Sequence, residues 1–335
     1  MRCLAFAATL RDHDVQAQFI VRDPNQAIMD LIQTRGFAVF PLDKTADFDH
    51  DAAFTAAAAK RSAAKFVLTD LGTVDNIKRK AQFERYFSLL QNAGPKTVVI
   101  DDFDKVDVPV AAQIVPYFGA EKIDYRRFAD TRYMLGADYF ICGPEQAARG
   151  SRERPIAETV RKIFISLGGS DPTGLTVDAI DALEALALTD TTIKVAVGAC
   201  FSNDLKSTLA RMAKDSTPAV ELCATADVPN LLLWADLAIT AIGLTRYEAA
   251  LAGTPSICLT RDDLKKYNND PFIQAGTSKH LSIPDDTHQD YLAKGINDIL
   301  GDYTQRRDMS TTGRRLIDGR GAERIISELK KTNLL

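Results

Sequence analysis

The chain has 335 residues, of which 46% are hydrophobic and 26% are charged, and its formal net charge is −4 at pH 7. This length suits two domains, and the small negative charge argues against a nucleic-acid-binding protein, which would carry a basic domain or stripe. No apolar run approaches the roughly 18–20 residues of a membrane span and the first residues make a poor signal peptide, so we expect a cytoplasmic protein.

The first half of the chain alternates helical and extended segments. Apolar residues at helical spacing mark the helices, and short runs rich in β-branched residues mark the strands. The stretch 143–158 is polar and aperiodic, which predicts a linker. We predict helices at 1–11, 24–34, 51–64 and 74–91, and strands at 17–21, 37–40, 66–69, 97–100, 111–115 and 139–142.

The alternation restarts after the linker. It favours an α/β fold with two doubly wound parallel sheets, whose domains would face a ligand-binding cleft. We predict strands at 163–167, 193–197, 220–222, 237–241 and 256–259, and helices at 174–187, 202–214, 229–234, 245–252, 264–275 and 288–300, with two more toward the C-terminus. The predicted divisions are an N-terminal domain at 1–145, a linker at 146–160, a C-terminal domain at 161–316, and a helix within 317–335 that can pack back on the first domain.

The stretch 162–176, KIFISLGGSDPTGLT, carries the first candidate site. A buried strand ends in Gly168 and Gly169, which give the backbone freedom and leave room for a ligand. Ser170 or Asp171 can cap the helix that follows. A strand, a glycine turn and a helix N-terminus together form an anion-binding arrangement, although an ordinary capped turn has the same sequence pattern.

A matching stretch lies at 236–255, DLAITAIGLTRYEAALAGTP. Its strand leads into Gly243, and Thr245 lies where a hydroxyl or a helix N-terminus can hold phosphate. Glu248 follows Thr245 by three residues, so the pair also fits a capping box, which is the simpler interpretation. Alternatively, the Glu248 carboxylate accepts hydrogen bonds from a ribose diol, as acidic residues do in dinucleotide-binding folds.

These motifs resemble those of the UDP-sugar hydrolases of pseudaminic acid biosynthesis and of their spore-coat polysaccharide relatives. The family is in turn similar to the UDP-N-acetylglucosamine transferase that makes lipid II, and its members have the GT-B fold of two Rossmann-like domains. The resemblance covers nearly the whole chain. It is carried by MRCLAFA at 1–7, FISLGGSDPTGLT at 164–176, ADLAITAIGLTRYEAALAGTPSI at 235–257 and IDGRGAERI at 317–325, with weaker support at 268–276.

The resemblance implies that the C-terminal half binds UDP. Glu248 would hold the ribose, and the helix N-terminus at Gly243, Leu244 and Thr245 would face the diphosphate. Backbone at Ala226, Asp227 and Val228 would meet the uracil. Gly168, Gly169 and Ser170 would lie beside the sugar and phosphates, and Asn268 belongs to the family's Asn-rich segment.

The chain also departs from the family pattern. Family members have a strand and a Gly-x-Gly-His turn directly before Met-Arg-Cys-Leu, and that histidine is the expected base; here Met1 opens the sequence, so the first strand of the domain is missing. The Asp-His-Tyr-Gly of the hydrolases is replaced by Thr-Asp-Leu-Gly at 69–72, and Tyr247 stands where they carry a small amide. An in-frame Gly-x-Gly-His upstream of Met1 would restore the enzyme interpretation.

Asp70 and Asp171 are the candidates for a replacement base. Asp70 ends a strand within the altered motif, and Asp171 lies beside the expected sugar, although helix capping is its simpler role. We expect His13 and His50 to be surface residues. Further candidates are a carboxylate cluster and a basic anion clamp, both of which more often form solvated surface: Asp101, Asp102 and Asp104, and Arg126, Arg127 and Arg132.

Cysteine and histidine spacing predicts neither disulfides nor a metal site. The cysteines at positions 3, 142, 200, 223 and 258 include no C-x-x-C pair, which suits reduced thiols. The histidines at positions 13, 50, 280 and 288 lack the spacing of metal ligands. We therefore expect no cofactor.

Three functions remain open. The first is a UDP-sugar hydrolase, in which a base activates water and helix-end N–H groups stabilise the departing diphosphate. The second is a GT-B glycosyltransferase, in which an acceptor hydroxyl replaces water. The third is a nucleotide-sugar-binding protein without turnover. The C-terminal motifs favour the first, the altered Asp-His-Tyr-Gly motif favours the second, and the absent histidine favours the third. The sugar and the oligomeric state are left open.

Overall fold

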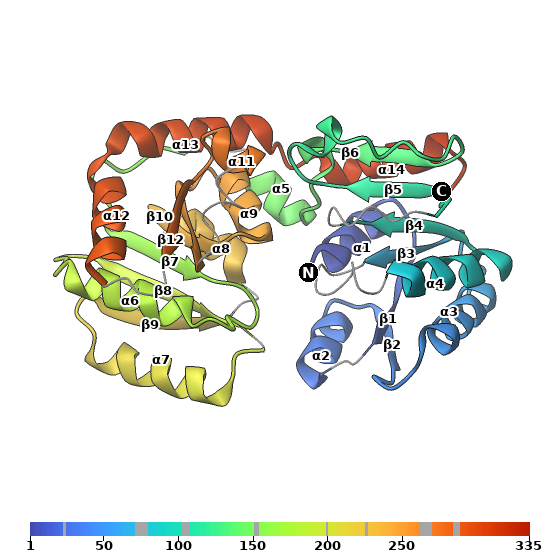
Figure 1. Ribbon diagram of the computed structural model, residues 1–335, viewed down its shortest axis with the longest axis horizontal. Helices are drawn as coiled ribbons and strands as arrows, with labels where there is room; N and C mark the ends of the chain where they lie inside the picture. Colours follow the sequence, from blue (N-terminus) through green and yellow to red (C-terminus); the bar gives the residue numbers. More distant parts are fainter. Residues whose placement is uncertain are drawn as a thin grey trace. The chain divides into compact units, whose positions relative to one another are not determined.

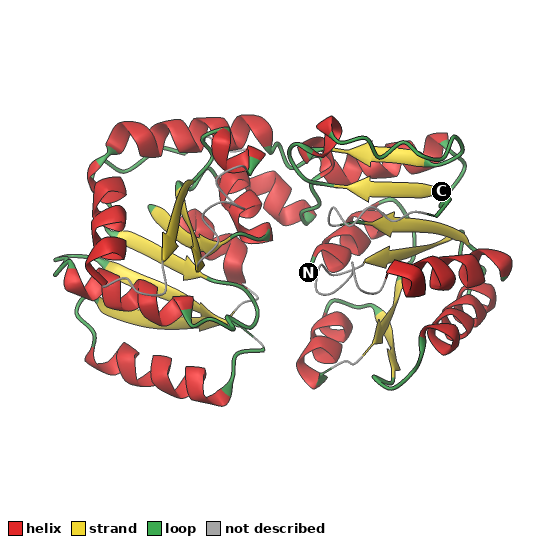
Figure 2. Ribbon diagram, viewed as in Figure 1, coloured by secondary structure: helices red, strands yellow, loops and turns green. Residues whose placement is uncertain are grey.

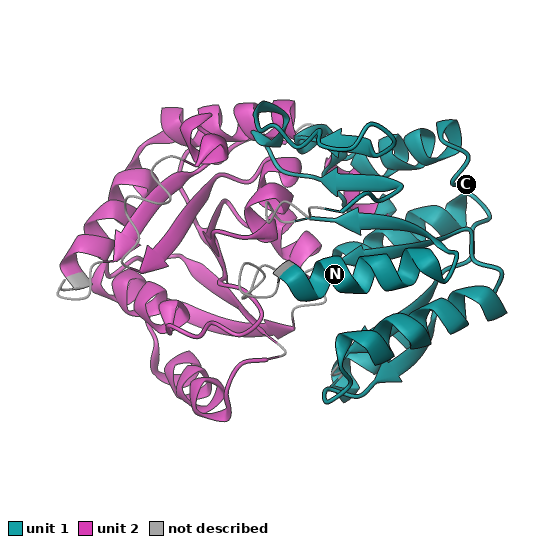
Figure 3. Ribbon diagram, turned by 45° about the vertical axis from the view of Figure 1, so that its right-hand side comes forward, with its two compact units in different colours: residues 1–144, 319–335 teal, residues 145–318 magenta. Residues whose placement is uncertain are grey.

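The chain forms two compact units (Figure 3): unit 1 contains Met1–Pro144 and Gly319–Leu335, and unit 2 contains Glu145–Asp318. The computed structural model describes residues 1–22, 25–70, 80–101, 108–150, 154–198, 200–224, 227–261, 270–283 and 289–335. Within these ranges no helix is long and apolar enough to cross a membrane.

Unit 2 is built on one six-stranded parallel sheet with the order β12-β11-β10-β7-β8-β9. Its central strands are apolar on both faces because helices cover the sheet on both sides (Figures 1 and 2). The strands are β7 (Lys162–Ser166), β8 (Thr192–Val197), β9 (Ala219–Ala224), β10 (Leu237–Ala241), β11 (Ser256–Arg261) and β12 (Lys279–Ile283). The helices are α5 (Pro144–Gly150), α6 (Leu175–Ala185), α7 (Asn203–Asp215), α8 (Val228–Trp234), α9 (Leu244–Ala252), α11 (Pro271–Gln274), α12 (Gln289–Gly301) and α13 (Tyr303–Leu316).

The sheet of unit 1 is in two parallel pieces, a pair β1-β2 and a four-stranded sheet β3-β4-β5-β6. The strands are β1 (Gln18–Arg22), β2 (Ala38–Leu42), β3 (Phe66–Asp70), β4 (Lys96–Ile100), β5 (Ala112–Val115) and β6 (Arg132–Leu135). The helices are α1 (Arg2–Asp12), α2 (Gln26–Thr34), α3 (Phe48–Arg61), α4 (Lys80–Asn92) and α14 (Gly321–Lys331), with short 3₁₀ turns η2 (Ala120–Lys122) and η3 (Ala137–Tyr139).

The last helix, α14, belongs to unit 1. Its apolar side chains Ile325, Ile326 and Leu329 are fully buried in the core with Phe6 of α1. Gly321 has no side chain at the point where α14 begins, which allows close packing against the backbone of Phe140.

The α/β class with parallel sheets is confirmed, but one predicted strand is wrong and two strands, β6 and β12, were not predicted. The run 139–142 is not a strand: Gly136, at φ +108°, turns the chain into η3, and Phe140 and Ile141 are buried as irregular backbone under α14. The strand of this region is β6, seven residues earlier, where Arg132 interrupts the apolar pattern. The sequence also gave no strand prediction for β12, where Lys279 and His280 open an edge strand.

The predicted linker is wrong as well. Its first residues form α5, and Gly150 packs closely against Leu251 of α9. Farther on, the Arg154 guanidinium donates to the carbonyls of Leu232 and Ala235 and, at 2.8 Å, to the Thr254 hydroxyl. Polar residues that look like a solvated linker therefore satisfy the buried backbone of unit 2.

Candidate functional site

The direction of the chain through the sheet of unit 2 reverses between β7 and β10. From β7 the chain continues to β8 and β9 on one side, and then returns to β10 on the other side. Ligands of open α/β sheets bind at the carboxyl ends of the strands flanking such a reversal. Ser166 of β7 is paired with Thr240 of β10, so the two predicted glycine turns lie side by side at this edge.

Both turns are open. Gly168, at φ +94°, Gly169 and Gly243 are exposed, and a Cβ atom added to any of them would meet nothing within 4 Å. Gly243 is the N-cap of α9, and no side chain among the described residues caps this helix end. The first N–H groups of α9, at Leu244 and Thr245, therefore have no side-chain acceptor, as in helix N-termini that bind phosphate.

Glu248 lies one turn into α9, and the capping-box interpretation is wrong. The N-cap is Gly243 rather than Thr245, and the Glu248 side chain makes no cap contact. The residue is half-buried, and burial raises the pKa of its carboxyl group, an effect that the neighbouring Gln146 amide of α5 partly offsets. A half-buried carboxylate needs polar groups to solvate its charged form, and a ligand can supply them.

Asp171 follows the first glycine turn and caps α6. Its carboxylate oxygens accept from the backbone N–H of Leu175 at 3.0 Å and of Thr176 at 2.8 Å, and the side chain is buried. Both oxygens are therefore used, which leaves Asp171 poorly suited to act as a base. Ser170 beside it is exposed.

The expected uracil contacts lie at the start of α8. Asp227 is exposed and accepts a hydrogen bond from the Asn230 amide at 2.5 Å. The Oδ1 atom of Asn230 in turn accepts from the Arg149 guanidinium of α5. Val228 is half-buried in the cluster where α8 packs against α9. Ala226 and Asn268 lie outside the described residues.

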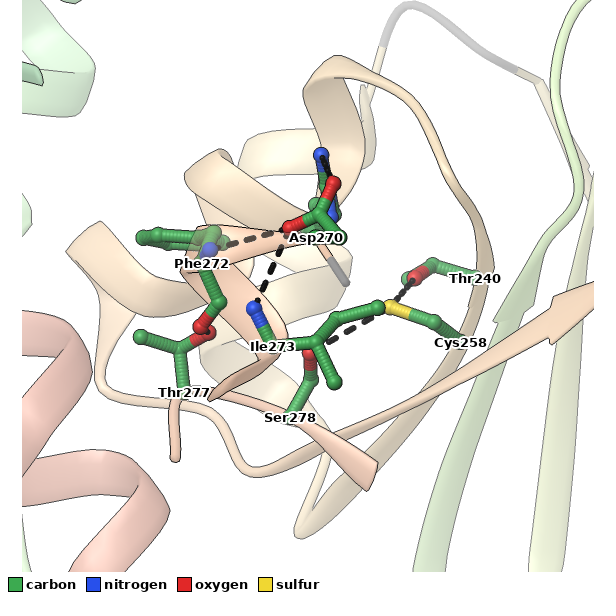
Figure 4. A network of polar contacts seen from close by, with 8 residues as sticks. Thr240, Cys258, Asp270, Phe272, Ile273, Thr277 and Ser278 are labelled. Carbon is green, nitrogen blue, oxygen red and sulfur yellow. Dashed lines mark hydrogen bonds and ion pairs between the residues drawn. The ribbon is translucent and has the colours of Figure 1, made fainter. Parts of the chain in front are cut away.

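A polar and aromatic cluster that the sequence did not reveal fixes α9 (Figure 4). Asp270 caps α11 through the N–H groups of Phe272 and Ile273, and accepts from Arg246 of α9 at 2.9 Å. The rings of Tyr247 and Phe272 stack with centroids 4.1 Å apart, and the Arg246 guanidinium lies over both rings. In the sequence, Arg246 directly follows the predicted phosphate-binding residues Gly243–Thr245, and this position was the one signal that could have pointed to it.

Below this cluster, Cys258 of β11 lies between two hydroxyls from neighbouring strand regions. Its Sγ atom is 3.5 Å from the Thr240 hydroxyl and 3.4 Å from that of Ser278 (Figure 4). The contact joins β10 to the segment before β12 inside the sheet, and buried polar atoms are satisfied in this way. Cys258 is therefore a buried thiol with a structural role.

Gly198, at the end of β8, positions the first glycine turn. A Cβ atom here would lie 2.5 Å from the Phe201 ring and closer still to the Gly169 carbonyl oxygen, which accepts from the N–H of Cys200 at 3.0 Å. The absence of a side chain at Gly198 therefore lets the turn rest on the neighbouring strand.

Gly198→Ala should displace the turn and destabilise unit 2 by about 1–2 kcal/mol, as overpacking does. Gly301→Ala is the matched control, since its Cβ would meet nothing within 4 Å. Trp234, the single tryptophan, lies in unit 2, so its fluorescence during urea unfolding measures this difference. Equal stability of both variants would contradict the prediction.

In unit 1, Asp70 is held by α1. Arg2 binds both carboxylate oxygens, with a 3.0 Å bond from Nε, and the Cys3 thiol donates at 3.1 Å. Burial raises the pKa of Asp70, but the hydrogen bonds and charge of Arg2 outweigh it, so the pKa is lowered overall. A carboxylate with a lowered pKa and two occupied oxygens is a poor base.

Asp70→Asn should therefore cost unit 1 about 1 kcal/mol at pH 7. The folded-state pKa of Asp70 is lowered. The stability that Asp70 contributes is therefore fully present above its unfolded-state pKa, and it is lost as the pH falls through its folded-state pKa. The difference from the wild type should shrink on acidification, which urea unfolding followed by circular dichroism measures. Asp49→Asn is the control: it removes an exposed ion pair with Arg85 and should show no resolvable change in stability. A stability difference for Asp70→Asn that does not change with pH would contradict the role of the ionised Asp70 carboxylate.

The other unit 1 candidates are paired or peripheral. His13 contacts Glu323 at 2.8 Å, His50 is exposed, Asp101 accepts from Gln113 at 2.6 Å, and Arg132 pairs with Glu328 of α14. Arg126 and Arg127 are exposed, and Asp102, Asp104 and positions 71–72 lie outside the described residues.

A depression of about 510 Å³ lies at the start of α3 in unit 1. Both arginines named in its lining are already paired, Arg22 with Asp51 and Arg85 with Asp49. We therefore assign it no ligand. Among the described residues there is also no group of three or more metal-ligating side chains.

Two α/β units built on parallel strands, with helix N-termini at the carboxyl edge of the second, define the GT-B class of fold. Solved structures of this class cover nearly the whole chain. They include S. aureus MnaA with UDP (TM-score 0.67, 12% identity, 100% of this chain and 94% of that one) and MurG of Acinetobacter baumannii (TM-score 0.59, 13% identity, 98% and 95%).

In sequence, the chain is similar to the spore coat polysaccharide biosynthesis protein SpsG of Bacillus subtilis, with 27% identity over 203 residues, which is 60% of this chain. This confirms the resemblance to the spore-coat relatives. The chain spans 59% of that protein's length and 61% of the length of a second relative, an uncharacterised protein of Methanocaldococcus jannaschii. No protein-family model matches the chain.

Proposed function

We propose that unit 2 binds the UDP moiety of a nucleotide sugar, and that the protein processes UDP-activated acetamido sugars in surface polysaccharide or flagellin glycan biosynthesis. The observation that carries the proposal is the edge between β7 and β10, with its open glycine turns, the uncapped N-terminus of α9 and the half-buried Glu248. The similarity to a spore-coat polysaccharide protein and the fold shared with S. aureus MnaA, solved with UDP, support it.

In this proposal the diphosphate lies at the N-terminus of α9 and in the turn at Gly168–Ser170. The N–H groups there stabilise the charge that develops on UDP as the bond to the sugar breaks. Glu248 accepts hydrogen bonds from the ribose diol, and backbone near Asp227 and Val228 contacts the uracil. The reaction needs no metal ion in this scheme, because N–H groups supply the positive field.

Hydrolysis is the reaction that we favour, with water as the acceptor. The base remains unassigned, because Asp70 and Asp171 are both engaged in the structure. Transfer to a sugar or lipid hydroxyl is the second candidate, and the fold shared with MurG favours it. Both reactions use the same UDP site.

The test combines UDP binding by calorimetry with UDP release from a panel of UDP-acetamido sugars on the same sample. Binding together with release in water supports the hydrolase. Release only on addition of an acceptor supports the transferase, and binding without release supports a nucleotide-sugar-binding protein. Failure to bind UDP would overturn the proposal in all three forms.

A further inference from the structure

The second half of helix α9 is fixed by close packing. Gly313 of α13 has no side chain where it meets α9, and a Cβ atom there would lie 2.9 Å from the Cα and Cβ atoms of Ala250. The C-cap of α9 is Gly253, whose carbonyl oxygen accepts a hydrogen bond from the Ser310 hydroxyl at 2.7 Å. These contacts hold the end of α9 that lies away from the proposed phosphate site.

The first turn of α9 is held differently, by two side-chain contacts with α11. Arg246 and Tyr247 follow each other in α9, and Asp270 and Phe272 lie at the start of α11. The Arg246 guanidinium donates to Asp270 through Nη2 at 2.9 Å. The rings of Tyr247 and Phe272 stack 4.1 Å apart, with an angle of 8° between their planes. A polar and an aromatic contact thus join the same two short stretches.

Asp270 uses its two carboxylate oxygens for different purposes (Figure 4). Its Oδ1 atom caps α11 by accepting from the N–H groups of Phe272 at 2.9 Å and Ile273 at 3.2 Å, whereas Oδ2 accepts from Arg246. The side chains of the ion pair are only 9% and 16% exposed. Because the cap fixes the direction of the carboxylate, it also fixes the direction of the guanidinium that binds it.

The buried position of Arg246 is costly. Within the described part of the chain, its Nε and Nη1 atoms are buried and have no hydrogen-bond partner. Unpaired buried donors cost free energy, and a cation in the first turn of a helix lies at the unfavourable, positive end of the helix dipole. A buried ion pair of this kind is a weak source of stability, so its geometry points to a role in orientation.

The orientation of this turn decides where its open N–H groups point. Leu244 and Thr245 precede Arg246 in the same turn, since a helical turn contains about 3.6 residues. Backbone N–H groups stabilise an anion only when they are aimed at it with suitable distance and angle. The contacts of Arg246 with α11 therefore control the part of the helix that would meet a phosphate group.

We propose that Arg246 is a positioning residue for the proposed UDP site: through its ion pair with Asp270 it aims the first turn of α9 at the diphosphate, without touching the nucleotide. This role rests on the proposed function and adds one property to it. The affinity of the site for phosphate groups depends on the pair of Arg246 and Asp270, whereas its affinity for the base and the ribose does not.

Titration of the full chain with UDP by calorimetry, and with the weaker ligand uridine by ligand-observed NMR, tests this. Arg246→Met removes the ion pair, and the Kd for UDP should rise at least about tenfold, because small misplacements of binding groups have effects of this size. The Kd for uridine, which has no phosphate, should stay within about twofold. Arg246→Lys keeps a cation for Asp270 and should restore most of the UDP affinity.

Asp270→Asn is the second variant, and it decides the outcome if Arg246→Met does not fold. The asparagine Oδ1 can still cap α11, but the ion pair is lost, so UDP should again bind more weakly and uridine unchanged. Tighter UDP binding would mean that the charge of the guanidinium acts rather than its orientation, and would overturn the inference.

Arg161→Met is the matched control. Arg161 also pairs with a carboxylate of unit 2, Asp190 at 3.8 Å, but it directly precedes β7 at the amino end of the sheet, so UDP affinity should not change. Equal UDP affinity of the wild type and Arg246→Met, or an equal loss for UDP and uridine, would overturn the inference and leave the proposed function standing. Failure of the wild type to bind UDP would overturn the proposed function, and the inference with it.

Discussion

Arg306→Met is expected to cost unit 2 about 3–5 kcal/mol, the largest effect of any single substitution considered. Arg306 of α13 is completely buried. Its guanidinium donates to the carbonyls of Ile299 at 2.8 Å and Leu300 at 2.5 Å, which end α12, and to those of Ala157 at 3.0 Å and Glu158 at 2.7 Å. Methionine fills the space but leaves four carbonyl acceptors without donors, of which that of Ile299 is buried and the others are partly buried.

Urea unfolding followed by Trp234 fluorescence measures this loss in unit 2. Arg307→Met is the matched control, because the neighbouring Arg307 is exposed and contacts only Asp308 among the partners described, so its stability should stay within about 0.5 kcal/mol of the wild type. Arg306→Lys should fall between the two, since an ammonium group cannot reach two pairs of carbonyls in the way a planar guanidinium does. A loss below about 1 kcal/mol for Arg306→Met would show that water replaces the guanidinium.

Glu248→Ala is expected to weaken UDP binding by about 1–3 kcal/mol, which is roughly a 5- to 150-fold increase in Kd. The loss arises because the two ribose hydroxyls would be desolvated without an acceptor. Calorimetric titration with UDP measures it, and titration with uracil gives the internal control, because the base alone should bind both proteins equally weakly. Unchanged UDP affinity would remove Glu248 from the site.

Glu248, which we expect to strengthen UDP binding, should lower the stability of the ligand-free protein at neutral pH. Because burial raises the pKa of Glu248, the folded state favours the protonated form, and the wild type loses stability as the pH rises from the unfolded-state value through the folded-state value. Glu248→Gln should therefore be more stable than the wild type at pH 7 and equal to it at pH 4. A stability difference that does not change with pH would contradict this.

Most elements of the fold could be predicted from the sequence, because their signals are local. The strand β7, the glycine turn after it and the capped helix α6 follow one another in the chain, and each leaves a clear pattern. The strand β6 was missed because Arg132 pairs with Glu328, a partner 196 residues away that no local pattern reveals. The predicted linker failed for the same reason, since Arg154 and Gly150 meet their partners only in the folded unit.

The candidate site was predictable to a similar extent. Glycine turns and helix starts are visible in the sequence, whereas the distinction between a cap and a ligand contact for Glu248 depends on which residue is the N-cap of α9. The link from Arg246 to Asp270 joins two helices and could not be read from either one alone. Asp70 was singled out as a base because a strand ends there, but its bond with Arg2 appears only when α1 folds back.

The return of α14 to unit 1 has a consequence for the order in which the protein is made. Unit 2 is continuous in sequence, so a ribosome releases all of it before the last 17 residues, Gly319–Leu335, emerge. The part of unit 1 that precedes unit 2 lacks Ile325, Ile326 and Leu329 of its core until the segment after unit 2 has been made. Domains fold as units during synthesis, so of the two units the one that is translated earlier is completed later.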